Sequence, residues 1–253
     1  MIKIFRKIRQ RLITENKFSK YLIYAIGEIT LVVIGILLAL QINNWNIDRT
    51  NKSESIKFNQ RLLTEVNENI VLINIKIKKI KSMVMSSKGI LELINKQPND
   101  ESLKSLDSLI FVSIMGVNNK VRTGTLNEGL NTGKVALIGS DDLKSKLYGL
   151  PSVIENISEA DKTYSHYNDQ ILQPFLFKNF NFRTMDQKFS GYDLGDSKFN
   201  FSHNKDLINN EQFENLIDNH FFQSNSQLLF HMSLKNQFEE IKKLIEEELP
   251  LKN

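Results

Sequence analysis

Residues 21–42 read YLIYAIGEITLVVIGILLALQI, a stretch in which thirteen of the 22 residues are Leu, Ile or Val and only Glu28, Thr30 and Gln41 interrupt the apolar run. As a helix rising about 1.5 Å per residue it would reach roughly 33 Å, enough to cross a hydrocarbon core of about 30 Å. Each aliphatic side chain favours insertion by roughly 0.3 to 0.6 kcal/mol, and their total exceeds the roughly 3 kcal/mol that opposes one central carboxylate. We therefore predict a transmembrane helix over residues 21–45.

Aromatic residues bracket this stretch. Tyr21 and Tyr24 stand at its start and Trp45 follows its end, as expected where aromatic rings settle at the two membrane–water interfaces. A helix buried in a soluble core is the alternative, but the apolar runs of such helices are usually shorter. We predict these three residues as interface anchors.

The basic charge of the chain is concentrated before the apolar stretch. Residues 1–20 hold seven of the 33 Lys and Arg residues and one of the 29 acidic residues, so the rest of the chain is close to neutral. The sequence pI of about 9.0 therefore does not indicate a nucleic-acid-binding surface. Since Lys and Arg favour the cytoplasmic side, the N-terminus is expected in the cytoplasm and residues 46–253 outside the cytoplasmic membrane.

Two further interpretations concern the N-terminal region. A cleaved signal peptide is the rival of an anchor, but the apolar run is longer than usual and no small-x-small cleavage site follows it. Within residues 1–20, apolar Met1, Phe5, Ile8 and Leu12 recur at helical spacing among basic residues. This pattern predicts a basic amphipathic cytoplasmic segment on anionic lipids, although the charges could instead serve only to set the topology.

Glu28, Gly35 and Ala39 fall close to one face of the predicted transmembrane helix. Small residues let a second helix approach closely, and a carboxyl group in the membrane prefers protein to lipid. The three residues are therefore a candidate face for a partner membrane protein or for homo-oligomers. The alternative is a lone helix in which Glu28 is merely tolerated.

A long helical pattern follows the anchor. Its apolar residues alternate steps of three and four, broken once by a serine: Leu63, Val66, Ile70, Ile73, Ile77, Ile80, Val84, Ser87, Leu91 and Ile94. A parallel coiled-coil dimer would oppose like charges at Lys76 and Lys81. Other apolar residues widen the stripe, which favours packing against helices of the same chain.

Turn and capping signals divide the middle of the chain. The helix should end near Gln97-Pro98, and a shorter apolar segment follows over residues 103–115. Thr125-Leu-Asn-Glu128 has the form of a capping box that opens a short helix, and Gly133 should close this helix. An extended link is expected over residues 134–139.

The remaining segments are predicted as follows. Ser140 caps a helix that should stop before Pro151, and helical spacing resumes to about Gln173. Residues 178–206 indicate a loop, and residues 212–248 form a second long amphipathic helix. We therefore predict an all-α protein in which residues 46–253 form an antiparallel helical bundle with two long helices.

No pattern of residues indicates chemistry. The chain has no Cys, which excludes thiolate nucleophiles and Cys-type metal sites. His220 and His231 share a helical face but lie eleven residues apart, too far for one metal ion. His166, beside Tyr164, Tyr167 and Asp169, is more typical of a structural histidine than of a catalytic one. We therefore expect no cofactor, no metal and no catalytic residue.

The opening FRKIRQRLITENKFSKYLIYAIGEITLVVIGILLALQINNWN resembles that of an uncharacterised family of small single-pass bacterial membrane proteins, a domain of unknown function. The block from Thr125 to Ile138 is similar to a second motif of that family, T-x-x-E-x-L-x-x-G-K-x-x-L-I. The resemblance implies an anchored helical protein of the bacterial inner membrane, and it carries no activity.

Taken together, these patterns favour a non-enzymatic membrane-anchored protein that binds a partner or scaffolds an assembly at the cell envelope. The alternative is an accessory or sensor subunit that signals through a partner transmembrane helix. An envelope enzyme with a site near His166 is the least favoured hypothesis.

Overall fold

The computed structural model describes residues 18–96, 103, 105–116, 120–195, 197, 198 and 204–250. All regular secondary structure in these ranges is helical, which confirms the prediction of an all-α chain. The elements are α2 (Phe18–Asn95), α4 (Leu106–Ser113), α5 (Gly124–Asn131), the 3₁₀ helix η1 (Lys134–Leu137), α6 (Asp141–Tyr167), the π-helical turn η2 (Asn168–Leu172), α7 (Gln173–Asn179), α8 (Phe182–Ser190), α9 (Asn204–Ile208) and α10 (Glu211–Glu248). The chain divides into two compact units, Met1–Ser55 and Ile56–Asn253.

The first unit contains the apolar part of α2. All thirteen Leu, Ile and Val side chains of residues 21–42 are exposed, and every side chain from 29 to 50 is exposed. Among the described residues, α2 is the one helix long and apolar enough to cross a membrane. The predicted amphipathic segment falls almost entirely on residues 1–17, which lie outside the described ranges.

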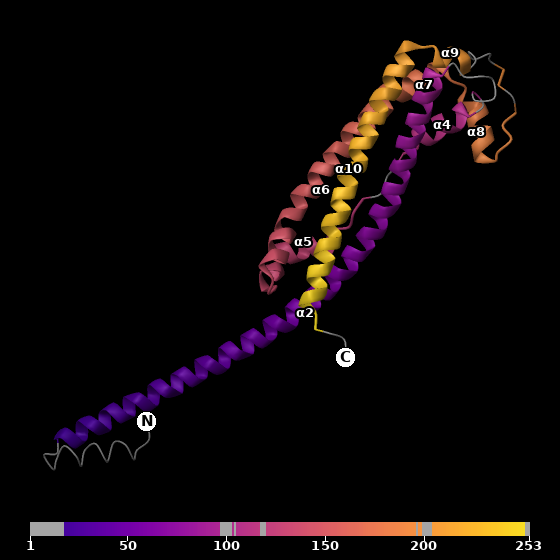
Figure 1. Ribbon diagram of the computed structural model, residues 1–253. Helices are drawn as coiled ribbons and strands as arrows, with labels where there is room; N and C mark the ends of the chain where they lie inside the picture. The colour runs from indigo at the N-terminus through magenta and orange to yellow at the C-terminus, as the bar shows by residue number, and fades with distance from the viewer. Residues whose placement is uncertain are drawn as a thin grey trace. The chain divides into compact units, whose positions relative to one another are not determined.

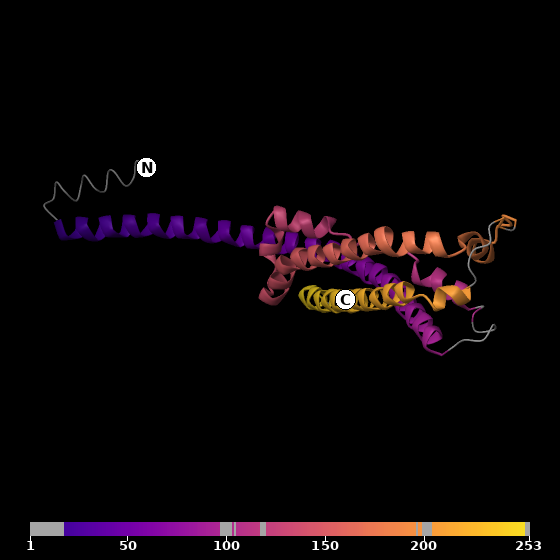
Figure 2. The same ribbon diagram turned by 90° about the horizontal axis from the view of Figure 1, so that it is seen from above.

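In the second unit, the later part of α2 packs with α6 and α10. Figure 1 shows these three helices side by side, with α5 near one end and α4, α7, α8 and α9 gathered at the other. Figure 2 shows the same grouping from above. The capping signals explain part of this arrangement, because the Ser140 hydroxyl accepts a hydrogen bond from the Leu143 N–H at 3.2 Å and starts α6 as predicted.

Two apolar clusters form the core of this unit. One cluster joins α2, α5, α6 and α10, and its fully buried members include Leu62, Leu143 and Ile245. The other joins the end of α2 with α4, α7 and the start of α10, and includes Ile90, Leu106 and Phe213. Along each of α2, α6 and α10, the residues between the two clusters include buried or partly buried polar side chains. This polar layer positions the candidate site.

The buried face of α2 is rotated from the predicted one. Its most buried positions follow a strict three-four alternation: Asn59, Leu62, Val66, Asn69, Ile73, Lys76, Ile80, Met83, Ser87 and Ile90. The predicted seam shares Val66, Ile73, Ile80 and Ser87 with this series. Its Leu63, Ile70 and Ile77 are only half-buried, at the edge of the same apolar cluster. Because Asn69 and Lys76 find polar partners in other segments, the helix can turn them toward the core.

The predicted capping box of α5 is wrong. The helix begins at Gly124, and its N-cap residue Thr123 makes no side-chain cap. Instead, the Glu65 carboxylate of α2 accepts hydrogen bonds from the N–H groups of Thr125 at 2.6 Å and Leu126 at 3.1 Å. Glu128, the predicted capping partner, pairs with Arg61 and Lys134. A carboxylate from another helix thus satisfies the amides that the local motif was expected to cap.

Gly133 does follow α5 in the left-handed conformation that favours glycine, with φ 74°. The segment after it is the 3₁₀ helix η1 instead of the predicted extended link, and it buries Val135 completely. A single 3₁₀ turn is the usual compact connector between helices.

Helix α6 continues through Pro151, where it was predicted to stop. A proline inside a helix costs roughly 3 kcal/mol, because the hydrogen bond to the carbonyl four residues earlier is lost. Leu143, Leu147 and Leu150 before the proline are buried, and Ile154 and Ile157 after it pack on the same cluster. Burial on both sides outweighs this cost, since each such side chain contributes roughly 1.5 to 3 kcal/mol when fully buried.

The predicted loop over residues 178–206 contains a helix, α8. Asn181 accepts a hydrogen bond from the Thr184 N–H at 3.3 Å, and Gly191 ends the helix with φ 77°. Met185 is its one buried residue and joins the apolar cluster beside α4. Phe182 and Phe189 pack against the same cluster, so apolar residues do recur at helical spacing in this helix, and the sequence analysis overlooked them among the neighbouring Asn, Gly and Asp residues.

Candidate functional site

The inward face of α10 is polar in its middle. His220, Ser224, Gln227 and His231 succeed one another at steps of four, three and four residues, and all four are buried. Phe221 and Leu228, two large apolar residues of this stretch, are only half-buried. Because buried polar groups must be hydrogen-bonded to offset desolvation, the partners of these side chains define the candidate site.

An ion pair and a histidine link three helices where this layer meets the cluster that contains Leu62 and Ile245. The Lys76 ammonium of α2 donates to Asp161 Oδ2 of α6 at 2.5 Å. His231 Nε2 of α10 lies 3.1 Å from Asp161 Oδ1, so both carboxylate oxygens are engaged. Burial acts to raise the pKa of Asp161, but the hydrogen bonds from His231 and Lys76 outweigh it and lower this pKa below its ordinary value.

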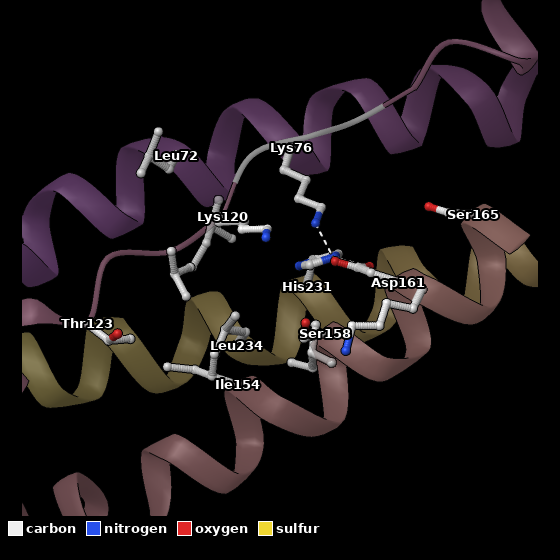
Figure 3. A pocket seen from close by; sticks show the side chains of 14 residues that line it. Leu72, Lys76, Lys120, Thr123, Ile154, Ser158, Asp161, Ser165, His231 and Leu234 are labelled. Atoms are coloured by element: carbon white, nitrogen blue, oxygen red, sulfur yellow. Dashed lines mark hydrogen bonds and ion pairs between the residues drawn. The ribbon is translucent and has the colours of Figure 1, made fainter. Parts of the chain in front are cut away.

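A pocket of about 430 Å³ opens beside this group. Figure 3 shows Leu72, Ile154 and Leu234 on one side of His231, and Lys76 and Asp161 on the other. The remaining lining residues come from α2, the segment before α5, α6 and α10: Ile73, Lys120, Val121, Thr123, Ile157, Ser158, Lys162 and Ser165. An apolar wall with a few converging polar groups is the usual character of a small-molecule site.

Two polar groups of the pocket lack a partner among the described residues. His231 Nδ1 is buried and has no hydrogen-bond partner within the described part of the chain. The Lys120 side chain is exposed and points its ammonium toward the space between Lys76 and His231 (Figure 3). No ion pair of Lys120 is found among the residues that the structure describes. Lys162, in contrast, donates to Glu159 at 2.5 Å.

A second polar network lies in the same layer. His220 of α10 is completely buried, with Nδ1 2.9 Å from Ser87 Oγ of α2 and Nε2 2.8 Å from the Tyr164 hydroxyl of α6. The Ser87 hydroxyl also donates to the Met83 carbonyl at 3.0 Å, so it accepts from Nδ1–H, and the Tyr164 hydroxyl donates to Nε2. Burial lowers the pKa of His220 to about 4 and raises that of Tyr164. This network is a neutral structural link between the three long helices.

The layer offers binding chemistry more readily than catalysis. Asp161 orients His231 as a carboxylate orients a general base, but within the described ranges no hydroxyl bonds to His231 Nδ1 to serve as a nucleophile. Those ranges also hold no group of three or more His, Cys, Asp or Glu residues that could bind a metal ion.

The residues singled out from the sequence lie elsewhere. Glu28, Gly35 and Ala39 are on α2 in the first unit, where a Cβ added at Gly35 meets no atom within 4 Å and Ala39 is exposed. Trp45 is 63% exposed, and the Arg49 guanidinium lies 5.8 Å from its ring centroid. Tyr24 is half-buried, and the side chain of Tyr21 is outside the described part.

His166 is exposed, and the neighbouring tyrosines that suggested a polar cluster around it bond to other helices. Its neighbour Tyr164 instead bonds to His220, and Tyr167 donates to the Leu216 carbonyl at 2.7 Å. The sequence signal that could have found the layer is the polar series at helical spacing on α10, together with Ser87, the one break in the apolar series of α2.

Comparison of the chain with protein-family models, with curated proteins and with solved structures gives no match.

Proposed function

We propose that this chain is a single-pass membrane protein whose helical domain binds a partner or scaffolds an assembly at the cell envelope, without enzymatic activity. Residues 21–45 span the bacterial inner membrane, residues 1–20 are cytoplasmic and contact anionic lipids, and residues 46–253 are extracytoplasmic. The single observation that carries this proposal is the exposure of all thirteen aliphatic side chains in residues 21–42. So large an apolar surface requires lipid or another apolar partner.

In the same proposal, residues 46–253 form an antiparallel bundle. The order in which the helices join the two apolar clusters supports this topology. Leu62 early in α2 shares a cluster with Ile245 late in α10, whereas Ile90 late in α2 shares the other cluster with Phe213 early in α10. Two helices that meet in reversed order along their lengths are antiparallel neighbours.

The membrane topology can be tested with single cysteines, because the chain has none of its own. Asn16→Cys reports on the predicted cytoplasmic end, and Ser226→Cys on an exposed position of α10. In intact cells with a permeable outer membrane, an impermeant maleimide should label position 226 at once and position 16 only after lysis. The reverse pattern contradicts the orientation, and release of the protein by alkaline carbonate contradicts the anchor.

The partner face is tested by capture of the full-length protein from membranes in mild detergent. We expect Gly35→Leu, combined with Glu28→Ala, to abolish co-purification of a membrane partner or of a second, differently tagged copy. Gly27→Leu is the control, since it makes the same change about 80° around the helix from Gly35. Equal recovery of the partner with both variants, or no partner with any of them, contradicts an assembly role for this face.

A sensor or accessory subunit is the second candidate. One observation favours it: helix α2 itself provides Leu72, Ile73 and Lys76 to the pocket and also contains the apolar span. Small shifts of such a helix are a known means of transmitting a signal. Site-specific crosslinking from Gly35→Cys should then capture a different membrane protein, and capture of nothing or only of a second copy contradicts this candidate.

A further inference from the structure

The pocket beside His231 is electrostatically one-sided. Three lysines line it, and Lys76 is paired with Asp161 and Lys162 with Glu159, so Lys120 is the lining cation without an ion pair among the described residues. Both oxygens of Asp161 already accept hydrogen bonds, from Lys76 at 2.5 Å and from His231 at 3.1 Å. A cationic ligand would therefore find no available carboxylate in this pocket.

An anionic ligand, in contrast, would find an available donor. The Lys120 ammonium points into the pocket near His231 and Lys76 (Figure 3). It is engaged in no ion pair with the described residues, and a charge-assisted hydrogen bond to a carboxylate is roughly twice as strong as a neutral one. The buried Nδ1 of His231 also lacks a partner in the described structure, but it is an acceptor in the neutral ring whose Nε2–H donates to Asp161, so the carboxylate is expected on Lys120 and not on this atom.

The rest of the wall is apolar. Six aliphatic side chains line the pocket: Leu72, Ile73, Val121, Ile154, Ile157 and Leu234. Leu234 and Ile154 lie close together and Leu72 lies across from them on α2, all on the side away from Asp161 (Figure 3). An inorganic anion would leave this wall without contacts, whereas a short hydrocarbon body would bury it.

We propose that this pocket binds a small amphipathic carboxylate, with the carboxylate on the Lys120 ammonium beside Lys76 and the hydrocarbon body on the aliphatic wall. The volume of about 430 Å³ is in the range of small-molecule sites. Three helices of one unit contribute to the wall, so a bound ligand stabilises their packing. The inference goes beyond the proposed function and does not depend on the location of the chain.

The test uses the full chain in lipid nanodiscs and octanoate as the probe, followed by isothermal titration calorimetry against empty nanodiscs. We expect saturable binding to one site. Octanol lacks the charge, acetate lacks the hydrocarbon body and octylammonium reverses the charge, so each should bind at least about tenfold more weakly. Equal binding of octanol or octylammonium, or uptake by empty nanodiscs that accounts for all the heat, overturns the proposal.

A pair of variants locates the site. Lys120→Gln should weaken octanoate binding about tenfold or more, and it should leave the melting temperature unchanged because Lys120 is exposed. Lys81→Gln is the matched control, an exposed lysine of α2 outside the pocket. The proposal fails if the two variants bind octanoate alike. Failure of the chain to enter nanodiscs would instead contradict the membrane anchor, and the same titration in buffer would still test the pocket.

Discussion

The Lys76 ammonium of α2 lies 2.5 Å from Asp161 Oδ2 of α6, and the Lys76 side chain is only 9% exposed. This pair determines the rotation of α2, because a buried ammonium without a counter-ion would be very costly. Turning the helix to bury Ile77 in place of Lys76 would break the pair. The ion pair therefore selects the observed face over the more apolar neighbouring one.

Removing either partner should destabilise the fold strongly. We expect Lys76→Met or Asp161→Leu to lower the free energy of unfolding by about 2 to 3 kcal/mol, somewhat less than for a fully buried pair because Asp161 is 28% exposed. The double variant should recover part of the loss and stay below the unmodified protein, because His231 Nε2 then also lacks its bond to Asp161. Denaturant unfolding measures all three values, and simple addition of the two single losses would contradict the coupling.

Gly129 permits the close approach of α5 to α2. A Cβ at this position would overlap the ring of Phe58, which is 2% exposed and cannot move aside into solvent. Gly129→Ala should therefore lower the free energy of unfolding by about 1 to 3 kcal/mol.

Gly149→Ala is the matched control, because a Cβ there meets nothing within 4 Å and the position is inside helix α6. It should be neutral or stabilise the protein by up to about 1 kcal/mol. Thermal unfolding compares the two variants, and the smaller Phe58→Leu side chain should restore part of the loss in Gly129→Ala. Equal melting temperatures for the two glycine variants would contradict the packing argument.

Features of the fold that depend on local sequence were predictable. The apolar run, the Ser140 cap, the left-handed Gly133 and the extent of α10 follow from residues close together in the chain. The start of α5 was not predictable, because its amides are capped by Glu65, about sixty residues earlier. The continuation of α6 through Pro151 likewise depends on burial against other helices, which outweighs the local preference of proline.

The candidate site was missed for a related reason. Lys76 and Asn69 have the polarity of surface residues, so a count of apolar residues assigns them to the outside of α2. Their burial depends on Asp161 and on the backbone of Arg122, which hydrogen-bonds to both ends of the Asn69 amide at 2.7 Å. Only the assembled structure brings these partners together.

Substitution of Glu65 should have a local effect on the first amides of α5, in addition to its effect on the stability of the whole protein. Glu65→Ala leaves the first amides of α5 without an acceptor and should lower the free energy of unfolding by about 1 kcal/mol. Amide hydrogen exchange should accelerate at Thr125 and Leu126, which donate to this carboxylate. Glu65→Gln keeps one acceptor oxygen, so its stability and its exchange rates should lie between those of the unmodified protein and those of Glu65→Ala. Unchanged exchange at both amides in Glu65→Ala would contradict this capping role.

His220 should make the stability of the protein depend on pH. Burial lowers the pKa of His220 to about 4 in the folded protein, from an ordinary value of 6.5. Between these two values the unfolded chain binds more protons than the folded one, so the free energy of unfolding falls as the pH falls. The loss should begin near pH 6.5 and reach about 3 kcal/mol at about pH 4.

The carboxylates change the stability in a lower pH range, so the contribution of His220 can be measured separately. The hydrogen bonds from Arg61 and Lys134 lower the pKa of Glu128 to about 2, and that of Asp161 is also below its ordinary 3.8. Their contributions are lost mainly below about pH 4.

His220→Gln should be less stable near pH 7, since its hydrogen bonds to Ser87 and Tyr164 are altered. It should also lack the fall in the free energy of unfolding that His220 causes between about pH 6.5 and 4. His166→Gln, at an exposed position, should retain this fall. Urea unfolding at a series of pH values measures this slope, and an equal slope in both variants would show that His220 is not its source.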